Sequence, residues 1–279
     1  MQKQHTRRNC NAPPAGLLAK KANRSLATLA IIPGTNQGNK TMKKIGLIGG
    51  MSFESTAVYY RLINEMVRAE LGGIASAEVL VHSVNFAEIV GYQKAGRWDL
   101  AEKRLADCAI ALQAAGADCI LICTNTMHLV ADGIAARLDI PLLHIVDETA
   151  AAIRQAGFGR PLVLATRYTM EHGFYTDRMR ALGLDPLVPD AEDRTIVHDV
   201  IFEELCAGTV KDASRAAYVA IIEKAKLAGA DCVILGCTEI CLLLDPDALP
   251  LPGFDSTTIH SRAAADFALQ AEPALRIAI

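Results

Sequence analysis

The sequence lacks the features that define several common classes of protein. Its longest apolar runs fall far short of the roughly 18–20 residues that a membrane-spanning helix needs. Eight cysteines in 279 residues are too few for a disulfide scaffold. Their spacings include no CxxC pair of the kind that binds structural zinc, and neither GxGxxG nor GxxxxGKS/T occurs to indicate a nucleotide. We therefore expect no membrane span, no metal, no nucleotide and a reducing, cytoplasmic location.

Acidic residues are absent from residues 1–40. This segment holds seven basic residues, Lys3, Arg7, Arg8, Lys20, Lys21, Arg24 and Lys40. Since the whole chain carries −3, the remainder carries −10. An acidic body is a poor partner for nucleic acid, because phosphates require clustered Lys and Arg. The proline and glycine content of residues 1–41 predicts a disordered basic extension, and a targeting peptide is the alternative.

From residue 42 onward, short apolar runs alternate with helical patterns. Strands are expected at 44–49, 78–84, 118–123, 141–145, 161–165, 185–188 and 231–235. Helices are expected at 55–69, 99–115, 126–138, 147–156, 170–182, 192–205, 214–228 and 256–269. This alternation predicts an α/β fold with parallel sheets covered by helices. Ligands of such sheets bind beyond the carboxyl ends of the strands.

Two stretches of the chain are nearly identical. Residues 115–124 read AGADCILICT, and residues 228–238 read AGADCVILGCT, with Gly236 as the extra residue. The duplication predicts two pseudo-symmetric lobes, one of residues 42–147 plus 256–279 and one of residues 148–255, with the active site in the cleft between them. Each copy ends in Cys-Thr, so Cys123 and Cys237 are expected to lie on opposite sides of that cleft.

Two opposed thiols suit the inversion of a stereocentre, because one group removes a Cα proton and the other returns one to the opposite face. A free thiol has a pKa of about 8.5, so a small downward shift yields a thiolate at neutral pH. We expect the following helix ends to favour that thiolate. Five other cysteines, Cys108, Cys119, Cys206, Cys232 and Cys241, are interpreted as small buried hydrophobes.

The titratable neighbours of the two cysteines are His128 and Glu239. Either could orient a thiol. The alternatives are an exposed histidine in a first helical turn and a glutamate that stabilises a helix start. Ser52, followed by Glu54, is interpreted as a helix cap.

Six motifs together resemble the aspartate/glutamate racemase superfamily over about residues 43–269. They are KKIGLIGGMSFESTAVYYRLINE (43–65), HSVNFAEI (82–89), CTNTMH (123–128), ATRYTMEHGFY (165–175), VIFEEL (200–205) and LGCTEI (235–240). The MSFEST segment is similar to the branch of aspartate racemases and broad-specificity amino-acid racemases.

The resemblance implies cofactor-independent racemisation of free α-amino acids, without pyridoxal phosphate or metal, commonly in a homodimer. It implies that Cys237 takes the proton from the L-amino acid and Cys123 from the D form. The positions that match substrate-binding residues of the family are Met51, Gln93, Thr124, Asn125, Thr126, Thr166, Thr169 and Thr238, with Ser52 and Glu239 as further candidates.

The preferred substrate stays open at the level of the sequence. Some aspartate racemases carry a basic residue just after the position of Thr169, where this chain has Met170 and Glu171. Arg167 and Arg97 are the remaining candidate anchors for an acidic side chain, and without them a neutral side chain would be accepted as well or better. Two other functions compete: a lyase or cis–trans isomerase of malonate- or maleate-like acids, and a two-lobed binding module.

Overall fold

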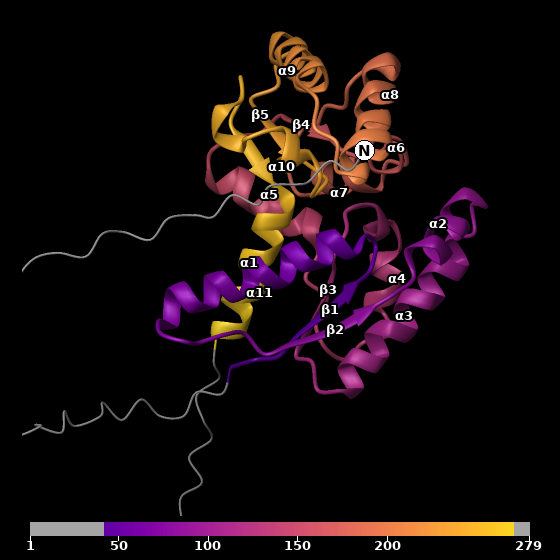
Figure 1. The fold of residues 1–279 in the computed structure, drawn as a ribbon, viewed down its shortest axis with the longest axis vertical. Helices are drawn as coiled ribbons and strands as arrows, with labels where there is room; N and C mark the ends of the chain where they lie inside the picture. Colours follow the sequence, from indigo (N-terminus) through magenta and orange to yellow (C-terminus); the bar gives the residue numbers. More distant parts are fainter. Residues whose placement is uncertain (1–41, 271–279) are drawn as a thin grey trace, which may run out of the picture. The chain divides into compact units, whose positions relative to one another are not determined.

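The computed structural model describes residues 42–270, and the predicted extension at residues 1–41 lies outside them. Two separate parallel sheets form the framework (Figure 1). The first has the order β2-β1-β3, and the second has the order β4-β5-β6. The predicted α/β class with two lobes is confirmed.

Helices follow the strands of the first sheet in chain order. The elements are β1 (Ile45–Gly49), α1 (Phe53–Leu71), β2 (Val79–Ser83), α2 (Phe86–Lys94), α3 (Trp98–Ala114), β3 (Cys119–Ile122), the 3-10 helix η1 (Thr126–Val130), α4 (Ala131–Ala135) and α5 (Ile145–Gln155). β1 and β3 are buried along their whole length, as their uninterrupted apolar sequences require. Ser52 caps α1 by accepting the backbone N–H of Ser55, as predicted.

The second sheet repeats this plan with shorter helices. Its elements are β4 (Pro161–Leu164), α6 (Arg167–Glu171), α7 (Phe174–Ala181), α8 (Ala191–Asp199), the π-helical turn η2 (Val200–Glu204), η3 (Leu205–Ala207), α9 (Asp212–Leu227), β5 (Cys232–Leu235), α10 (Ile240–Leu243), η4 (Pro246–Ala248), β6 (Gly253–Asp255) and α11 (Ser256–Leu269). Residues Cys232–Leu235 pair with Pro161–Leu164 in parallel, and both strands are fully buried.

Several predicted elements differ from the structure. Residues 141–145 and 185–188 form only isolated bridges, through Leu142 and Leu187. The helix predicted at 126–138 is divided into η1 and α4, and the one at 170–182 is interrupted at Gly173, whose φ is 77°. Neither α2 nor β6 is among the predicted elements.

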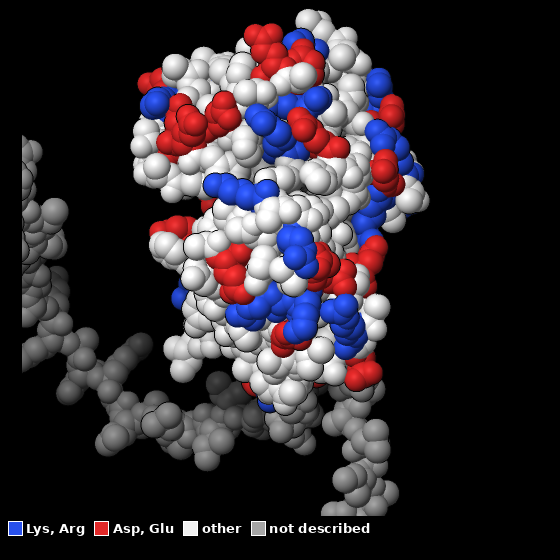
Figure 2. Space-filling view, turned by 90° about the vertical axis from the view of Figure 1, so that its right-hand side faces the viewer, with Lys and Arg blue, Asp and Glu red and all other residues white. Residues whose placement is uncertain are grey.

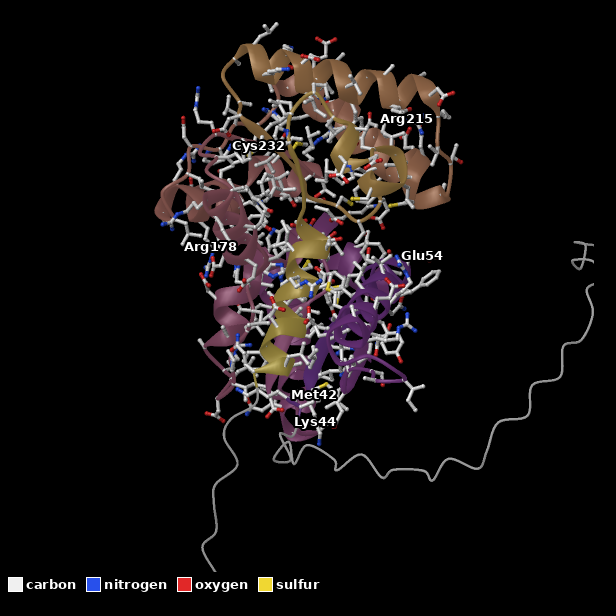
Figure 3. The ribbon with its side chains drawn as sticks, turned by 90° about the vertical axis from the view of Figure 1, so that its left-hand side faces the viewer. Met42, Lys44, Glu54, Arg178, Arg215 and Cys232 are labelled. Carbon is white, nitrogen blue, oxygen red and sulfur yellow. The ribbon has the colours of Figure 1, made fainter. Side chains whose placement is uncertain are left out.

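The last helix returns to the first sheet. α11 packs against both α1 and α5, and Figures 1 and 3 show it beside α1. Arg178 of α7 adds an ionic connection by pairing with Asp147 of α5 and with Asp132 of α4. Cys232 lies in the upper part of Figure 3, within the second sheet, and Arg178 lies where the upper and lower parts meet.

No helix within residues 42–270 combines the length and apolarity needed to cross a bilayer. On the face drawn in Figure 2, basic and acidic side chains are interspersed instead of gathered into areas of one sign. That face therefore offers no basic stripe of the kind that follows a phosphate backbone.

Candidate active site

One cavity lies at the carboxyl ends of both sheets, and both lobes line it. Cys123 directly follows β3 of the first sheet, and Cys237 follows β5 of the second after Gly236. Both residues line this cavity, which we call the cleft. The duplicated strands therefore bring the two Cys-Thr pairs to one space, because the carboxyl ends of both sheets face it.

Glu239 is the centre of a hydrogen-bond network beside Cys237. Its Oε2 accepts the Cys237 thiol at 2.8 Å and the Thr238 hydroxyl at 2.7 Å. Its Oε1 accepts the hydroxyls of Ser52 at 3.2 Å and Ser55 at 3.3 Å, across from α1. Both oxygens are thus occupied, and the carboxylate connects the second lobe to the start of α1.

The surroundings of the two thiols favour the protonated form over the thiolate. Burial raises the pKa of Cys123 far above its usual range. Burial, and then the charge of Glu239 and its hydrogen bond, raise the pKa of Cys237 as well. The expectation of a thiolate favoured by helix ends is therefore wrong, because the helices that follow are single turns and burial outweighs their dipoles. Glu239 is the carboxylate that accepts the hydrogen bond of the Cys237 thiol.

Asn125 lines the cleft and carries an unpaired acceptor. Its Nδ2 donates to Ser256 Oγ at 3.1 Å, and Ser256 in turn donates to the Leu235 carbonyl at 3.0 Å. The amide is therefore oriented by α11, while its Oδ1 is buried without a hydrogen-bond partner in the structure. A buried acceptor of this kind favours a donor such as an ammonium group.

Three threonine hydroxyls meet where the lobes face each other. Thr126 Oγ1 lies 2.9 Å from Thr166 Oγ1 and 3.3 Å from Thr169 Oγ1. Thr126 and Thr166 line the cleft, whereas Thr169 is fully buried and contacts the other two. The three hydroxyls join the loop after β3 to the first turn of α6.

Most of the site residues expected from the sequence line the cleft. They are Met51, Ser52, Gln93, Cys123, Thr124, Asn125, Thr126, Thr166, Cys237, Thr238 and Glu239.

The two candidate arginine anchors do not line the cleft. Arg97 forms two hydrogen bonds to Asp99, at 2.8 and 2.6 Å, on the surface. Arg167 begins α6, and its charge acts on His198, whose pKa is lowered first by burial and then by Arg167.

His128 is buried and forms hydrogen bonds to the backbone. Both interpretations made from the sequence, an exposed histidine and a group that orients a thiol, are therefore wrong. The Nδ1 of His128 donates to the Thr124 carbonyl at 2.8 Å, and its Nε2 accepts the N–H of Ile145 at 3.2 Å. The side chain therefore connects the loop after Cys123 to the start of α5 and does not orient a thiol.

Sequence reasoning missed several further residues that line the cleft. Ser55, Phe86, Met127, Tyr168, Ile201, Phe202, Cys206, Gly236 and Thr257 complete its lining. The interpretation of Cys206 as buried is wrong, since it is exposed, while Cys119 and Cys232 are fully buried as predicted. Phe86, Tyr168, Ile201 and Phe202 fall inside motifs already singled out, which was the available signal.

Comparison with known proteins assigns the family. The model of the Asp/Glu/Hydantoin racemase family matches residues 48–264. The broad specificity amino-acid racemase RacX of Bacillus subtilis is 25% identical over 165 residues, which are 59% of this chain and 71% of RacX.

Two solved structures are similar over most of the chain. A candidate Asp/Glu racemase from Yersinia pestis is 50% identical with a TM-score of 0.79, over 82% of this chain and 100% of that one. An aspartate racemase homologue from Pyrococcus horikoshii OT3 is 36% identical with a TM-score of 0.73, over 81% and 99% of the two chains. The chain belongs to the Asp/Glu/hydantoin racemase family.

Proposed function

We propose that this protein racemises free α-amino acids with Cys123 and Cys237 as the two acid/base groups. The observation that carries the proposal is that each of two duplicated strands ends in a cysteine lining the same cleft, one from each sheet. Membership of a racemase family supports the reaction class.

The contacts around Cys237 support the first step. Glu239 accepts the thiol proton and leaves a Cys237 thiolate. The thiolate removes the Cα proton of the L-amino acid, and the Cys123 thiol gives its proton to the opposite face of the carbanion. The cysteines have then exchanged protonation states, which is the state that accepts the D form. The same roles in reverse convert D to L.

The amino and carboxylate groups of the substrate have partners in the cleft. Asn125 Oδ1 is free to accept from the ammonium group. The hydroxyls of Thr124 and Thr126, which line the same cleft as the two thiols, are donors for the carboxylate. The Thr238 hydroxyl donates to Glu239 and joins them only when it gives up that hydrogen bond. Donors fixed before the reaction stabilise negative charge as it develops on the carboxylate side of the carbanion.

Replacing either cysteine tests the mechanism. Cys123→Ala and Cys237→Ala should each reduce racemisation at least about 10³-fold in both directions, because each face of Cα loses its proton carrier. Chiral chromatography of L and D substrates measures this.

The matched controls are Cys119→Ala and Cys232→Ala, earlier in the same strands and outside the cleft lining. These should retain racemisation, and full racemisation by Cys123→Ala would contradict the mechanism. Malonate- and maleate-type acids belong in the same assay, since turnover of those alone would indicate the lyase or isomerase.

Three expectations from the resemblance are also proposals. Activity should need neither pyridoxal phosphate nor metal, so dialysis against EDTA and treatment with hydroxylamine should leave it intact. We further propose a homodimer and a cytoplasmic location, which light scattering and cell fractionation would test.

A further inference from the structure

Within residues 42–270, no side chain that lines the cleft carries a positive charge that could hold a second carboxylate. Among the described residues that line it, Glu239 is the only one with a formally charged side chain. Its two oxygens already accept four hydrogen bonds, from Cys237, Thr238, Ser52 and Ser55. The charge that an acidic substrate side chain would meet is therefore negative.

The two candidate arginine anchors are engaged elsewhere. Arg97 is paired with Asp99 and has about half of its side chain exposed. Arg167 lies against α8, where its charge acts on His198. A desolvated carboxylate without a charged partner is costly to bind, so neither arginine in its present place offsets that cost.

The walls of the cleft that helical residues form are uncharged and largely apolar. Phe86 and Met127 come from the first lobe, and Tyr168, Ile201 and Phe202 come from the second. Ile201 and Phe202 lie in the π-helical turn η2, a feature that often occurs at functional sites. The one amide on these walls, Gln93, donates to Met127 Sδ at 3.1 Å.

Most of the polar lining residues follow β1, β3, β4 and β5, whereas most of the apolar ones lie in helices. The polar groups after the strands serve the ammonium and carboxylate of the substrate in the proposed mechanism. Phe86, Tyr168, Ile201 and Phe202 are the large lining residues that remain for the substrate side chain.

We infer that the preferred substrates are amino acids with uncharged side chains, and that aspartate and glutamate are poor substrates. The inference rests on the proposed function. The apolar walls bind the aliphatic part of the side chain, and Gln93 is the adjacent polar group for an amide or thioether end.

Two isosteric pairs of substrates isolate charge from size. Asparagine and aspartate, and glutamine and glutamate, should be compared by kcat/KM, with solvent deuterium at Cα followed by NMR. We expect the amide to be preferred at least about tenfold in each pair, with methionine also converted. Equal or faster turnover of the acids, dependent on both cysteines, would overturn this inference and leave the racemase standing. Absence of Cα exchange in every amino acid would instead reject the proposed function.

A charge placed on the wall supplies the second test. Phe202 is 39% exposed, so Phe202→Arg should fold, and Phe202→Met is the matched neutral variant. The arginine should move the glutamate-to-glutamine ratio at least about tenfold toward glutamate, whereas methionine should leave that ratio unchanged. A glutamate-to-glutamine ratio that moves equally in the arginine and methionine variants would contradict the proposal that the substrate side chain binds at this wall.

Arg167→Met tests whether Arg167 turns into the cleft. The acid-to-amide ratio should not change in this variant. Selective loss of aspartate and glutamate turnover would identify Arg167 as their anchor and overturn the inference.

Discussion

Glu239 and Cys237 form a pair in which the carboxylate influences the protonation of the thiol. The thiol donates to the carboxylate at 2.8 Å, and both are held among neutral groups. Burial and the nearby negative charge both disfavour the thiolate. In the proposed mechanism, the substrate's own ammonium group is the positive charge that favours proton transfer from Cys237 when the cleft is filled.

Replacing Glu239 separates its effect on the pKa of Cys237 from its role as a proton acceptor. In Glu239→Gln, loss of the negative charge lowers the pKa of Cys237, so iodoacetamide should alkylate this thiol faster at pH 8. Racemisation should fall at least about tenfold, because the proton acceptor is lost. Peptide mass spectrometry distinguishes Cys237 from the exposed Cys206.

The control for that experiment is Glu203→Gln, which removes the same charge from an exposed position in η2. This variant should change neither the rate of Cys237 alkylation nor the rate of racemisation. Unchanged or slower alkylation of Cys237 in Glu239→Gln would show that the carboxylate does not hold the thiol proton.

At the scale of the elements, Gly236 determines how the second cysteine leaves its strand. Its N–H donates to the Leu164 carbonyl at 2.7 Å, so the ends of β4 and β5 approach closely here. A Cβ at this position would lie 2.9 Å from Ala165 Cβ and 3.0 Å from the Leu164 carbonyl oxygen. The extra residue of the second repeat is therefore a glycine for steric reasons.

Gly236→Ala should separate these strand ends and displace Cys237. We expect unfolding to require about 1–3 kcal/mol less free energy, as in other overpacked sites. We also expect kcat to fall about tenfold or more, because a displacement of the thiol weakens proton transfer. Denaturant unfolding and steady-state kinetics measure the two effects.

Gly91→Ala in α2 is the matched control, since a Cβ there meets nothing within 4 Å. It should keep activity and gain up to about 1 kcal/mol from higher helix propensity. Equal activity of the two alanine variants would contradict the steric role of Gly236.

The elements that could be predicted are those whose signal is local and repeated. The buried strands β1, β3, β4 and β5 have continuous apolar sequences, and the long helices α1, α3 and α9 have regular periodicity. α2 buries only Ile89 and contains Gly91, so its periodicity is weak. β6 has three residues and exists only because β5 lies beside it.

The same distinction holds for the site. The cysteines and threonines could be located because they follow strands whose ends must meet at one edge. Phe86, Tyr168, Ile201 and Phe202 could not, because they reach the cleft through the packing of helices from two lobes. The raised pKa of each thiol also depends on burial, which the sequence does not give directly.

Three buried histidines connect the parts of the whole molecule. The ring of His128 lies 4.6 Å from that of His144 and 5.6 Å from that of His260. His260 in α11 accepts from Tyr59 of α1 at 2.9 Å and donates to the Leu143 carbonyl at 2.8 Å. Each ring accepts a hydrogen bond at one nitrogen, and that nitrogen therefore carries no proton. The cluster requires neutral histidines.

This cluster predicts sensitivity to acid. Burial lowers the pKa of His260 to about 4. Burial and the charge of Arg178 lower that of His144 to about 4. Burial also lowers the pKa of His128 well below its usual range. Unfolded histidines titrate near about 6.5, so the stabilisation is complete above that pH and is lost as the pH falls toward 4.

The free energy of unfolding should therefore fall between pH 6.5 and 4 by up to about 1.4 kcal/mol per pH unit for each histidine. Urea titrations at several pH values measure the slope. His260→Gln should reduce that slope, whereas His82→Gln on β2, outside the cluster, should not. A slope unchanged in His260→Gln would contradict the assignment.

The central claim is that two thiols act on opposite faces of one stereocentre, and hydrogen exchange in D₂O tests it most directly. An L-amino acid incubated in D₂O and sampled before a tenth has reacted should give D product carrying deuterium at Cα. The remaining L substrate should still carry protium, because its own face is served by a different group. Deuterium appearing equally in both enantiomers, or D product that retains the original protium, would show that a single group serves both faces and would contradict the account.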